Sequence, residues 1–188
     1  MTRKQPPEPQ YSQQQPLEQQ QPLEQQQPAS NVYAQHDHHA CVDAALQQAR
    51  ALCATEGARL TPIRQRVLEL VWQSHKPVGA YDLLPILAAE GFNSAPPTVY
   101  RALDFLLDLG LVHRINSLNA FVGCSHPGEQ HPSCFFVCNQ CGEAQELQAS
   151  QVQKVAAQVE QMLGVVVQQQ TTELMGLCPR CQEHRQHD

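Results

Sequence analysis

Residues 96–124, PPTVYRALDFLLDLGLVHRINSLNAFVGC, predict a helix that is followed directly by a β-hairpin. Two prolines are typical of the first turn of a helix, and Gly110 is typical of its end. Between them, apolar side chains recur at helical spacing, at Val99, Ala102, Leu103 and Leu106. Two short β-prone runs then flank the turn sequence NSLN. We interpret this stretch as the second half of a winged helix-turn-helix.

The preceding residues supply the other helices that such a domain needs. Residues 42–55 and 60–74 each place apolar side chains on one helical face, and a Thr-Pro pair favours the start of the second helix. A third helix is expected over residues 80–91, where a glycine ends it. Residues 41–123 therefore predict a winged-helix domain.

The chain changes character from residue 124 onwards. Residues 134–148 predict two strands joined by a turn that contains cysteines, and residues 149–163 predict an amphipathic helix. The β-prone residues 165–178 then lead into a second pair of cysteines. Residues 124–188 thus predict a small α+β domain, which a metal ion and dimerisation would both help to stabilise. The fold class of the whole chain is α+β.

Residues 1–40 predict a disordered tail. Within it, residues 13–30 repeat a glutamine- and proline-rich hexapeptide, which has little apolar surface to offset the entropy lost on ordering. The tail ends in three histidines, His36, His38 and His39, which we interpret as solvated, with weak metal binding as the alternative. No apolar run approaches the roughly 18 residues of a membrane span, and no secretory signal is evident. We therefore expect a cytoplasmic location, where thiols stay reduced.

The net charge of −6 is unevenly distributed along the chain. Residues 48–116 hold seven Lys or Arg against six Asp or Glu, whereas both flanking segments are acidic. A small basic face is therefore compatible with the predicted winged-helix domain. The overall charge neither establishes nor excludes DNA as a partner.

Two CxxC pairs, CNQC and CPRC, predict a structural zinc site. Each pair directs two thiolates towards one centre, and two pairs complete a tetrahedron. The four ligands are Cys138, Cys141, Cys178 and Cys181. A thioredoxin-like redox site would need a single pair near a βαβ pattern. Because four protein ligands leave no open position on the metal, this site is not expected to be catalytic.

A second group of potential metal ligands surrounds Cys124. The group offers a thiol, three imidazoles and two carboxylates, from Cys124, His113, His126, His131, Glu143 and Glu146. Any one of these histidines alone is more typical of a protein surface than of a metal site. Together they form a mixed sulfur, nitrogen and oxygen set, which is a weaker signal than paired cysteines. The remaining cysteines, Cys41, Cys53 and Cys134, are not predicted to be ligands.

Several of these stretches resemble the ferric uptake regulator family and, within it, the zinc uptake regulator branch. The resemblance rests on RLTPIRQRVLELV, AYDLL, PPTVYRALDFLLDLGLVHRI, CNQCG and GLCPRC, and extends over about residues 42–182. It implies a dimeric, metal-activated repressor. It also implies an N-terminal winged-helix domain that binds DNA and a C-terminal α+β domain that dimerises.

The resemblance further implies two zinc ions per chain. The structural ion falls on the four paired cysteines, and the sensory ion falls on His113, Cys124, His131 and Glu146. Because the loop after Cys124 is shorter than in relatives, His126 is an alternative to His131. The thiolate of Cys124 favours Zn²⁺ over the harder Fe²⁺ and Mn²⁺.

The implied partner is double-stranded operator DNA, an AT-rich pseudo-palindrome that controls zinc-uptake genes and is bound by a homodimer. On the helix that follows Pro97, Tyr100 and Arg101 face outward, and Arg101 can donate two hydrogen bonds to guanine. Tyr81 and Arg64 are expected to contact phosphates or sugars. Three alternatives stay open: an iron or peroxide sensor of the same family, a purely structural interaction protein, and a zinc hydrolase.

Overall fold

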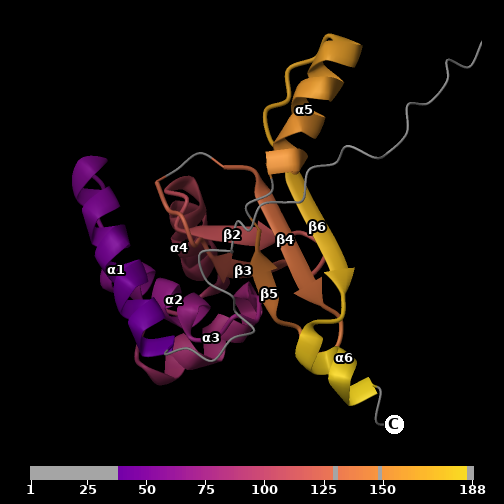
Figure 1. The fold of residues 1–188 in the computed structure, drawn as a ribbon. Coiled ribbons are helices and arrows are strands. Elements are labelled where there is room, and N and C mark those ends of the chain that lie inside the picture. The colour runs from indigo at the N-terminus through magenta and orange to yellow at the C-terminus, as the bar shows by residue number, and fades with distance from the viewer. Residues whose placement is uncertain (1–37, 129–130, 148–149, 186–188) are drawn as a thin grey trace, which may run out of the picture.

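A computed structural model describes residues 38–128, 131–147 and 150–185 (Figure 1). Its helices are α1 (His38–Thr55), α2 (Pro62–Trp72), α3 (Ala80–Ala89), α4 (Pro96–Asp108), α5 (Ser150–Leu163) and α6 (Pro179–Arg185). Its strands are β1 (Val78–Gly79), β2 (Val112–Ile115), β3 (Ala120–Gly123), β4 (Ser133–Cys138), β5 (Ala144–Glu146) and β6 (Thr171–Gly176). The mixed helix and strand content confirms the predicted α+β class.

Helices α1 to α4 pack around one apolar core, as the helical spacing of their apolar residues predicts. Prolines occupy the first turns of α2 and α4, where the missing N–H group has no helical partner to lose. The most deeply buried side chains of this core have no exposed surface: Ala49, Val67, Leu68, Leu83, Leu87, Val99, Leu103 and Leu106. The core holds α4 with its polar face turned outward.

The predicted hairpin is formed by β2 and β3, with His113 opposite Val122. Asn119 ends the connecting turn with a φ of 50°, a left-handed conformation that asparagine tolerates better than most residues. At the end of β3, a Cβ on Gly123 would lie 2.1 Å from the ring of Trp72. Only glycine allows this contact, which seats the hairpin against α2.

The second sheet has the strand order β5-β4-β6. Strands β4 and β5 form an antiparallel pair, whereas β4 and β6 run parallel, with Cys138 opposite Gly176. The chain between β5 and β6 includes α5, which projects beyond one end of the sheet, while α6 lies at the other end (Figure 1). This sheet and its helices form the predicted C-terminal α+β unit.

The hairpin and the second sheet are packed against each other. Five buried side chains form the cluster between them: Ile115, Val122, Phe135, Val137 and Ala144. The N–H group of Ala144 also donates a hydrogen bond of 2.8 Å to the carbonyl oxygen of His75. The contact between the two units is therefore both apolar and hydrogen bonded.

Three features differ from the sequence prediction. Helix α1 begins at His38, so the last residues of the predicted tail are helical, and the ring of His38 lies 4.8 Å from that of His75. Residues 1–37, including His36, lie outside the described residues. The β-prone residues 165–178 form a strand only from Thr171, where pairing with β4 begins. Helix α6 and strand β1 were not predicted, because each is too short to show periodicity.

Within the described ranges, every helix is too short or too polar to cross a membrane.

Candidate metal centres and nucleic-acid interface

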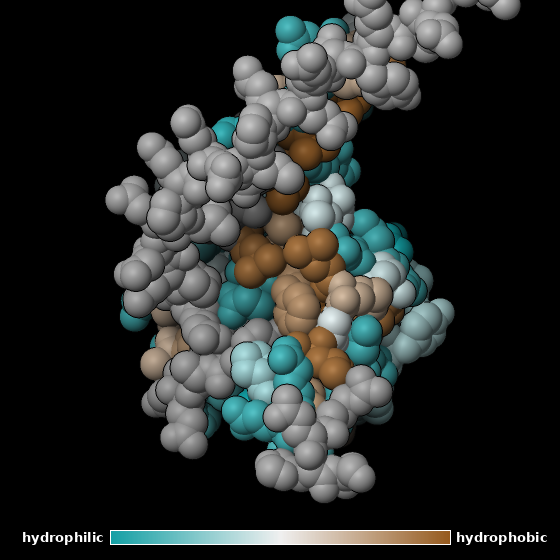
Figure 2. Space-filling model, turned by 45° about the vertical axis from the view of Figure 1, so that its right-hand side comes forward, coloured by the Kyte–Doolittle hydropathy of each residue, from teal (hydrophilic) through white to brown (hydrophobic). Residues whose placement is uncertain are grey.

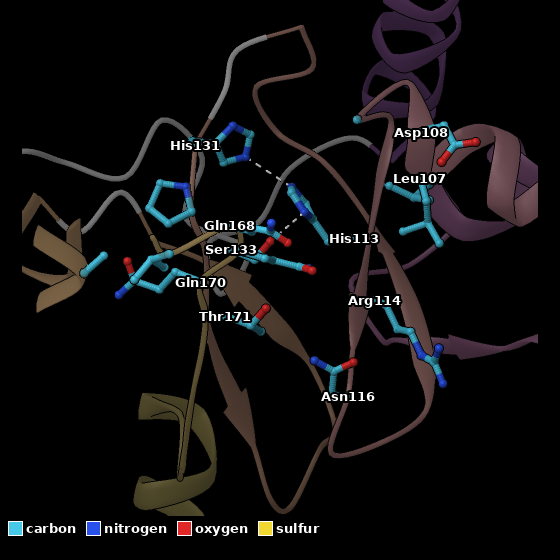
Figure 3. Close-up of a pocket in the computed structure, with 16 residues that line it drawn as sticks. Leu107, Asp108, His113, Arg114, Asn116, His131, Ser133, Gln168, Gln170 and Thr171 are labelled. Carbon is cyan, nitrogen blue, oxygen red and sulfur yellow. Dashed lines mark hydrogen bonds between the residues drawn. The ribbon is translucent and has the colours of Figure 1, made fainter. Parts of the chain in front are cut away.

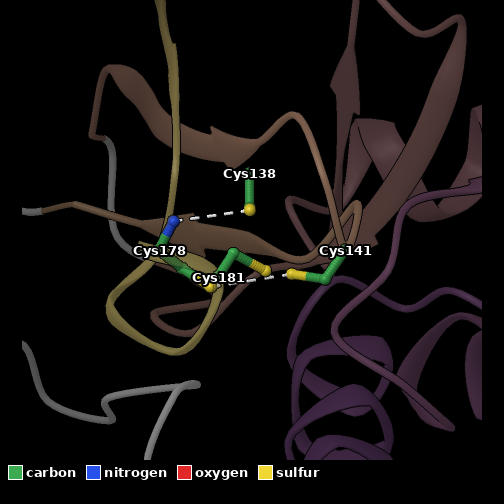
Figure 4. A group of neighbouring side chains, drawn as sticks. All are labelled: Cys138, Cys141, Cys178 and Cys181. Carbon is green, nitrogen blue, oxygen red and sulfur yellow. Dashed lines mark hydrogen bonds between the residues drawn. The ribbon is translucent and has the colours of Figure 1, made fainter. Parts of the chain in front are cut away.

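The four paired cysteines meet at one end of the second sheet (Figure 4). Cys138 ends β4 and Cys141 lies in the turn after it, while Cys178 and Cys181 follow β6. Because β4 and β6 are parallel neighbours, their ends deliver both pairs to the same place. All four sulfur atoms lie within 4.8 Å of one another.

The spacing of these sulfur atoms suits zinc. The Sγ atoms of Cys141 and Cys178 are 3.8 Å apart. Four sulfurs at about 2.3 Å from a tetrahedral zinc ion would lie about 3.8 Å from one another. The predicted group of four is therefore brought together, and the distance between Cys141 and Cys178 is the one that a four-thiolate zinc site requires.

The surroundings of Cys138 favour the thiolate that a metal needs. Burial alone would raise the pKa of Cys138, but N–H groups of Cys141, Cys178 and Gln140 outweigh it and lower the pKa to about 6. One of these donors, the N–H group of Cys178, lies 3.4 Å from the Cys138 sulfur. Burial and the neighbouring thiols instead raise the pKa of Cys181 to about 12. Cys138 thus loses its proton more readily than Cys181, and metal binding would displace the proton that Cys181 retains.

A second group forms where the hairpin meets the second sheet. His113 lies on β2, Cys124 directly follows β3, His131 precedes β4 and Glu146 ends β5. Their ligand atoms all lie within 4.8 Å of one another. Two separate structural units therefore contribute to one cluster, which the sequence spacing alone did not require.

The distances within the second group also suit a tetrahedral ion. The Nε2 atoms of His113 and His131 are 3.1 Å apart, and the Nε2 atom of His131 is 3.6 Å from the sulfur of Cys124. Oε1 of Glu146 lies 2.8 Å from His131 Nε2 and 3.1 Å from His113 Nε2. Ligands at 2.0 to 2.3 Å from zinc would be about 3.3 to 3.8 Å apart. Small outward shifts would accommodate the ion.

Glu146 is ionised despite its burial. Burial raises its pKa, but His113, the N–H group of Ser125 and His131 together lower the pKa to about 2. The Ser125 N–H group donates to Oε2 at 2.8 Å, which leaves Oε1 directed at the two imidazoles. The carboxylate therefore offers one oriented oxygen to the cluster.

Ser133 orients His113, a role that the sequence reasoning missed. The hydroxyl of Ser133 lies 3.0 Å from Nδ1 of His113, so that Nε2 is the nitrogen that faces the cluster (Figure 3). Metal-binding histidines commonly use their second nitrogen for such a hydrogen bond. The packing of the hairpin against the second sheet brings this serine to His113, and no local sequence signal marks it.

His126 lies beside the second group and not in it. Its ring centre is 6.2 Å from that of His131. Among the described residues, the groups of three or more potential ligands are the two above, and His126 belongs to neither. Cys134 also stays outside them; its burial, with the nearby charge of Glu146, raises the pKa of the thiol.

A groove of about 1110 Å³ reaches the second group from solvent. Its lining includes His113, His131 and Ser133, together with Gln168 and Gln170 from the segment before β6 (Figure 3). Two of the four potential ligands, His113 and His131, thus border this groove, whereas Cys124 and Glu146 are buried.

The proposed DNA-facing residues gather at the start of α4. Tyr100 and Arg101 are exposed there, and Tyr81 at the start of α3 is 66% exposed. The rings of Tyr81 and Tyr100 meet edge to face, with centres 6.4 Å apart. The two helices therefore present one continuous surface.

Arg64, which is expected to contact the phosphate backbone of DNA, also makes contacts within the protein. Its guanidinium group lies 3.5 Å from the centre of the Phe105 ring, and one N–H group donates to the Arg59 carbonyl oxygen at 2.7 Å. The side chain is half-buried between α2 and α4. It therefore serves the packing of α4 whatever else it contacts.

Comparisons with known proteins place this architecture among metal-dependent regulators. Residues 55–175 match the ferric uptake regulator family. The chain is 40% identical over 140 residues to the zinc uptake regulation protein of Escherichia coli (strain K12), covering 73% of this chain and 81% of that protein. The matched range of the family includes all four residues of the second group and ends before Cys178.

Two solved structures are similar over most of their length. A zinc uptake regulator complexed with zinc and DNA matches with a TM-score of 0.73 and 37% identity, over 77% of this chain and 97% of that one. The holo form of a protein named XcZur matches with a TM-score of 0.66 and 43% identity, over 77% and 98%. Neighbours of this type have an N-terminal winged helix-turn-helix and a dimerisation domain.

Proposed function

This chain belongs to the ferric uptake regulator family, and on that premise we propose that it is a zinc-responsive transcriptional repressor. Its zinc-loaded dimer binds operator DNA and represses genes for zinc uptake. It is a regulator and not an enzyme. The observation that carries the proposal is the second ligand group, whose four donors come from both the hairpin and the second sheet. The relative solved with zinc and DNA supports the same function.

We assign one structural and one regulatory zinc ion to each chain. Cys138, Cys141, Cys178 and Cys181 would hold the structural ion, and His113, Cys124, His131 and Glu146 would hold the regulatory ion. The single sulfur among the regulatory ligands distinguishes zinc from iron, because Fe²⁺ has less affinity for thiolate at such a site. An iron or peroxide sensor is the less favoured alternative for this reason.

The regulatory ligands would link metal binding to DNA binding. A bound zinc ion would supply four bonds that join the hairpin to the second sheet. His113 holds the hairpin side of the cluster and Glu146 holds the sheet side. Since closure of the two units would orient α4 in the dimer, zinc and operator would bind cooperatively. A typical coupling of about 1 to 3 kcal/mol changes operator affinity about 5- to 150-fold.

Helix α4 would enter the major groove. Arg101 would read a guanine through two hydrogen bonds, and Tyr100 would contact a thymine methyl group or a phosphate. Tyr81 would contact the backbone, as would those N–H groups of Arg64 that do not face Phe105 or Arg59. We divide the chain after Gly123, with the DNA-binding domain before this point and the dimerisation domain after it.

A second copy of the chain would cover the apolar surface around α5 and β6. Seven large apolar side chains are exposed there: Val155, Met162, Leu163, Val165, Val166, Leu174 and Met175. Figure 2 shows apolar surface on the side of the molecule that these elements occupy. A two-fold dimer matches a pseudo-palindromic operator, and we propose that this operator is AT-rich. Because the proposed partner is operator DNA, we propose a cytoplasmic location.

The decisive experiment measures operator binding against free zinc concentration. Duplexes selected from a random pool by the zinc-loaded protein provide the operator, and fluorescence anisotropy provides the affinity. We expect about two zinc ions per chain and at least about fivefold tighter binding with zinc than with the regulatory site empty. Equal affinity at all zinc concentrations would contradict the proposal. A response to Fe²⁺ or peroxide instead would favour the alternative.

A further inference from the structure

A second contact joins the hairpin to the second sheet, and it involves no residue of either ligand group. The carboxylate of Glu173, on β6, accepts hydrogen bonds from two backbone N–H groups in the turn between β2 and β3. The Asn116 N–H group donates to Oε1 at 2.7 Å, and the Ser117 N–H group donates to Oε2 at 3.1 Å. More than 50 residues separate the carboxylate from the turn in the sequence.

Glu173 and Glu146 occupy equivalent places on either side of one buried residue. Both are paired in register with Phe135, Glu146 from β5 and Glu173 from β6. Paired residues share a face of the sheet, and Phe135 is packed against the hairpin residues Ile115 and Val122. The hairpin is thus held at three points in a row: a carboxylate in the ligand group, an apolar centre and a second carboxylate.

We propose that Glu173 is a positioning residue for DNA binding, which fastens the tip of the hairpin to the dimerisation sheet without a metal ion. This inference rests on the proposed function, because it assumes that the hairpin and α4 move together on DNA. Glu173 touches neither the DNA nor the zinc. It acts through the turn that it holds.

The chemistry of the contact supports a strong attachment. Hydrogen bonds to an ionised carboxylate are about twice as strong as those between neutral groups. Burial alone would raise the pKa of Glu173, but Ser117 and the N–H group of Asn116 outweigh it, so the pKa lies below its ordinary value. The turn itself, residues 116–119, is exposed. Without Glu173 its N–H groups would turn to water, and the hairpin would lose a fixed point beyond the apolar cluster.

The test compares Glu173→Ala and Glu173→Gln with wild type in operator binding at saturating zinc. We expect Glu173→Ala to bind about tenfold more weakly, within the usual range for coupled sites. Glu173→Gln keeps an acceptor oxygen but loses the charge, and we expect an intermediate affinity. Both variants should stay dimeric and keep the wild-type zinc content.

A matched control and a local measurement separate positioning from simple stability. The control is Glu160→Gln. The carboxylate of Glu160 also accepts a hydrogen bond from a backbone N–H group, that of Val167 at 2.8 Å, but both residues lie within the dimerisation unit. We expect this substitution to leave operator affinity unchanged. Hydrogen exchange should accelerate at Asn116 and Ser117 in Glu173→Ala and Glu173→Gln, and stay unchanged in the sheet.

Failure of this inference can be told apart from failure of the proposed function. If wild type responds to zinc and Glu173→Ala binds operator with wild-type affinity, the positioning role is wrong. If hydrogen exchange at Asn116 and Ser117 accelerates but operator affinity does not change, the contact of Glu173 stabilises the turn and has no role in DNA binding. If wild type itself ignores zinc, the proposed function fails. The ratio of variant to wild-type affinity still decides the role of Glu173.

Discussion

Cys124 is the one sulfur donor of the second ligand group, so a substitution there can separate the proposed zinc sensing from the stability of the fold. We predict that Cys124→Ser stays folded and dimeric, because the four paired cysteines are untouched. It should hold about one zinc ion per chain where wild type holds about two. Its operator affinity should equal that of wild type with an empty regulatory site, as measured by anisotropy with parallel metal analysis.

Cys41→Ser is the control for this prediction, because Cys41 is half-buried and outside both groups. His113→Ala should reproduce the Cys124→Ser result from the hairpin side. If Cys124→Ser retains zinc-dependent operator binding at wild-type affinity, the thiolate is no ligand, and the preference for zinc over iron loses its basis.

Ser133 offers a finer test of the same cluster. Ser133→Ala removes the hydroxyl that orients His113, and we predict that the zinc affinity of the regulatory site falls about 10- to 100-fold. Competition with a chelator of known affinity would measure this. Ser125→Ala is the matched control, since Ser125 contacts Glu146 through its backbone N–H group, which alanine retains. Equal zinc affinity of both variants would show that Ser133 has no orienting role.

Helix α4 allows a distinction between reading bases and holding the backbone. We predict that Arg101→Ala costs about 1 to 3 kcal/mol of operator binding and relaxes the preference at one base pair. Arg64→Ala should weaken binding to all sequences alike. It should also reduce the slope of log affinity against log salt concentration by about one. It should also lower the melting temperature, because the contact with Phe105 is worth about 0.5 to 1 kcal/mol.

The measurement is binding to operator and to random duplexes over a range of salt concentrations. An unchanged ratio between operator and random DNA in Arg101→Ala would contradict base reading. A wild-type salt dependence in Arg64→Ala would limit Arg64 to the packing of α4.

Helices with a periodic pattern of apolar residues could be predicted from the sequence. Very short elements, and strands that depend on a partner far away in the chain, could not. Helices α2 and α4 were expected because prolines start them and apolar residues recur along them. Strand β1 consists of two residues whose only reason to be extended is the edge of β3. The same limit applies to residues 165–170, whose β-prone side chains have no partner strand in the described structure.

The candidate sites divide in the same way. The CxxC spacing was sufficient to predict the four paired cysteines as zinc ligands, because the two cysteines of each pair are close in the sequence and two such pairs complete a tetrahedron. The choice of His131 over His126 came from family resemblance, since both lie in one loop. Ser133 and Glu173 could not be found, because their roles arise from the packing of the hairpin on the second sheet.

At the scale of the whole molecule, the four-thiolate site should stabilise the fold. We predict that Cys178→Ser lowers the melting temperature and shifts the protein from dimer towards monomer, because metal-binding free energy at such a site is also folding free energy. Differential scanning calorimetry and analytical ultracentrifugation would measure both effects. Glu143→Gln, which removes the surface ion pair with Arg180 near the same site, is the control. A variant with full zinc content and an unchanged melting temperature would contradict the assignment.

The parallel pairing of β4 with β6 has a consequence for the speed of folding. Paired residues such as Ser133 and Thr171 are 38 positions apart in the chain, whereas the hydrogen bonds within each of the helices α1 to α4 join residues only about four positions apart. The chain must lose the entropy of loop closure before the contacts between these strands can form. The second sheet should therefore form after the helices and set the slowest step of folding. A zinc ion bound by both cysteine pairs would close the same loop. We therefore expect refolding to be faster with zinc present from the start than with zinc added after the helices have formed.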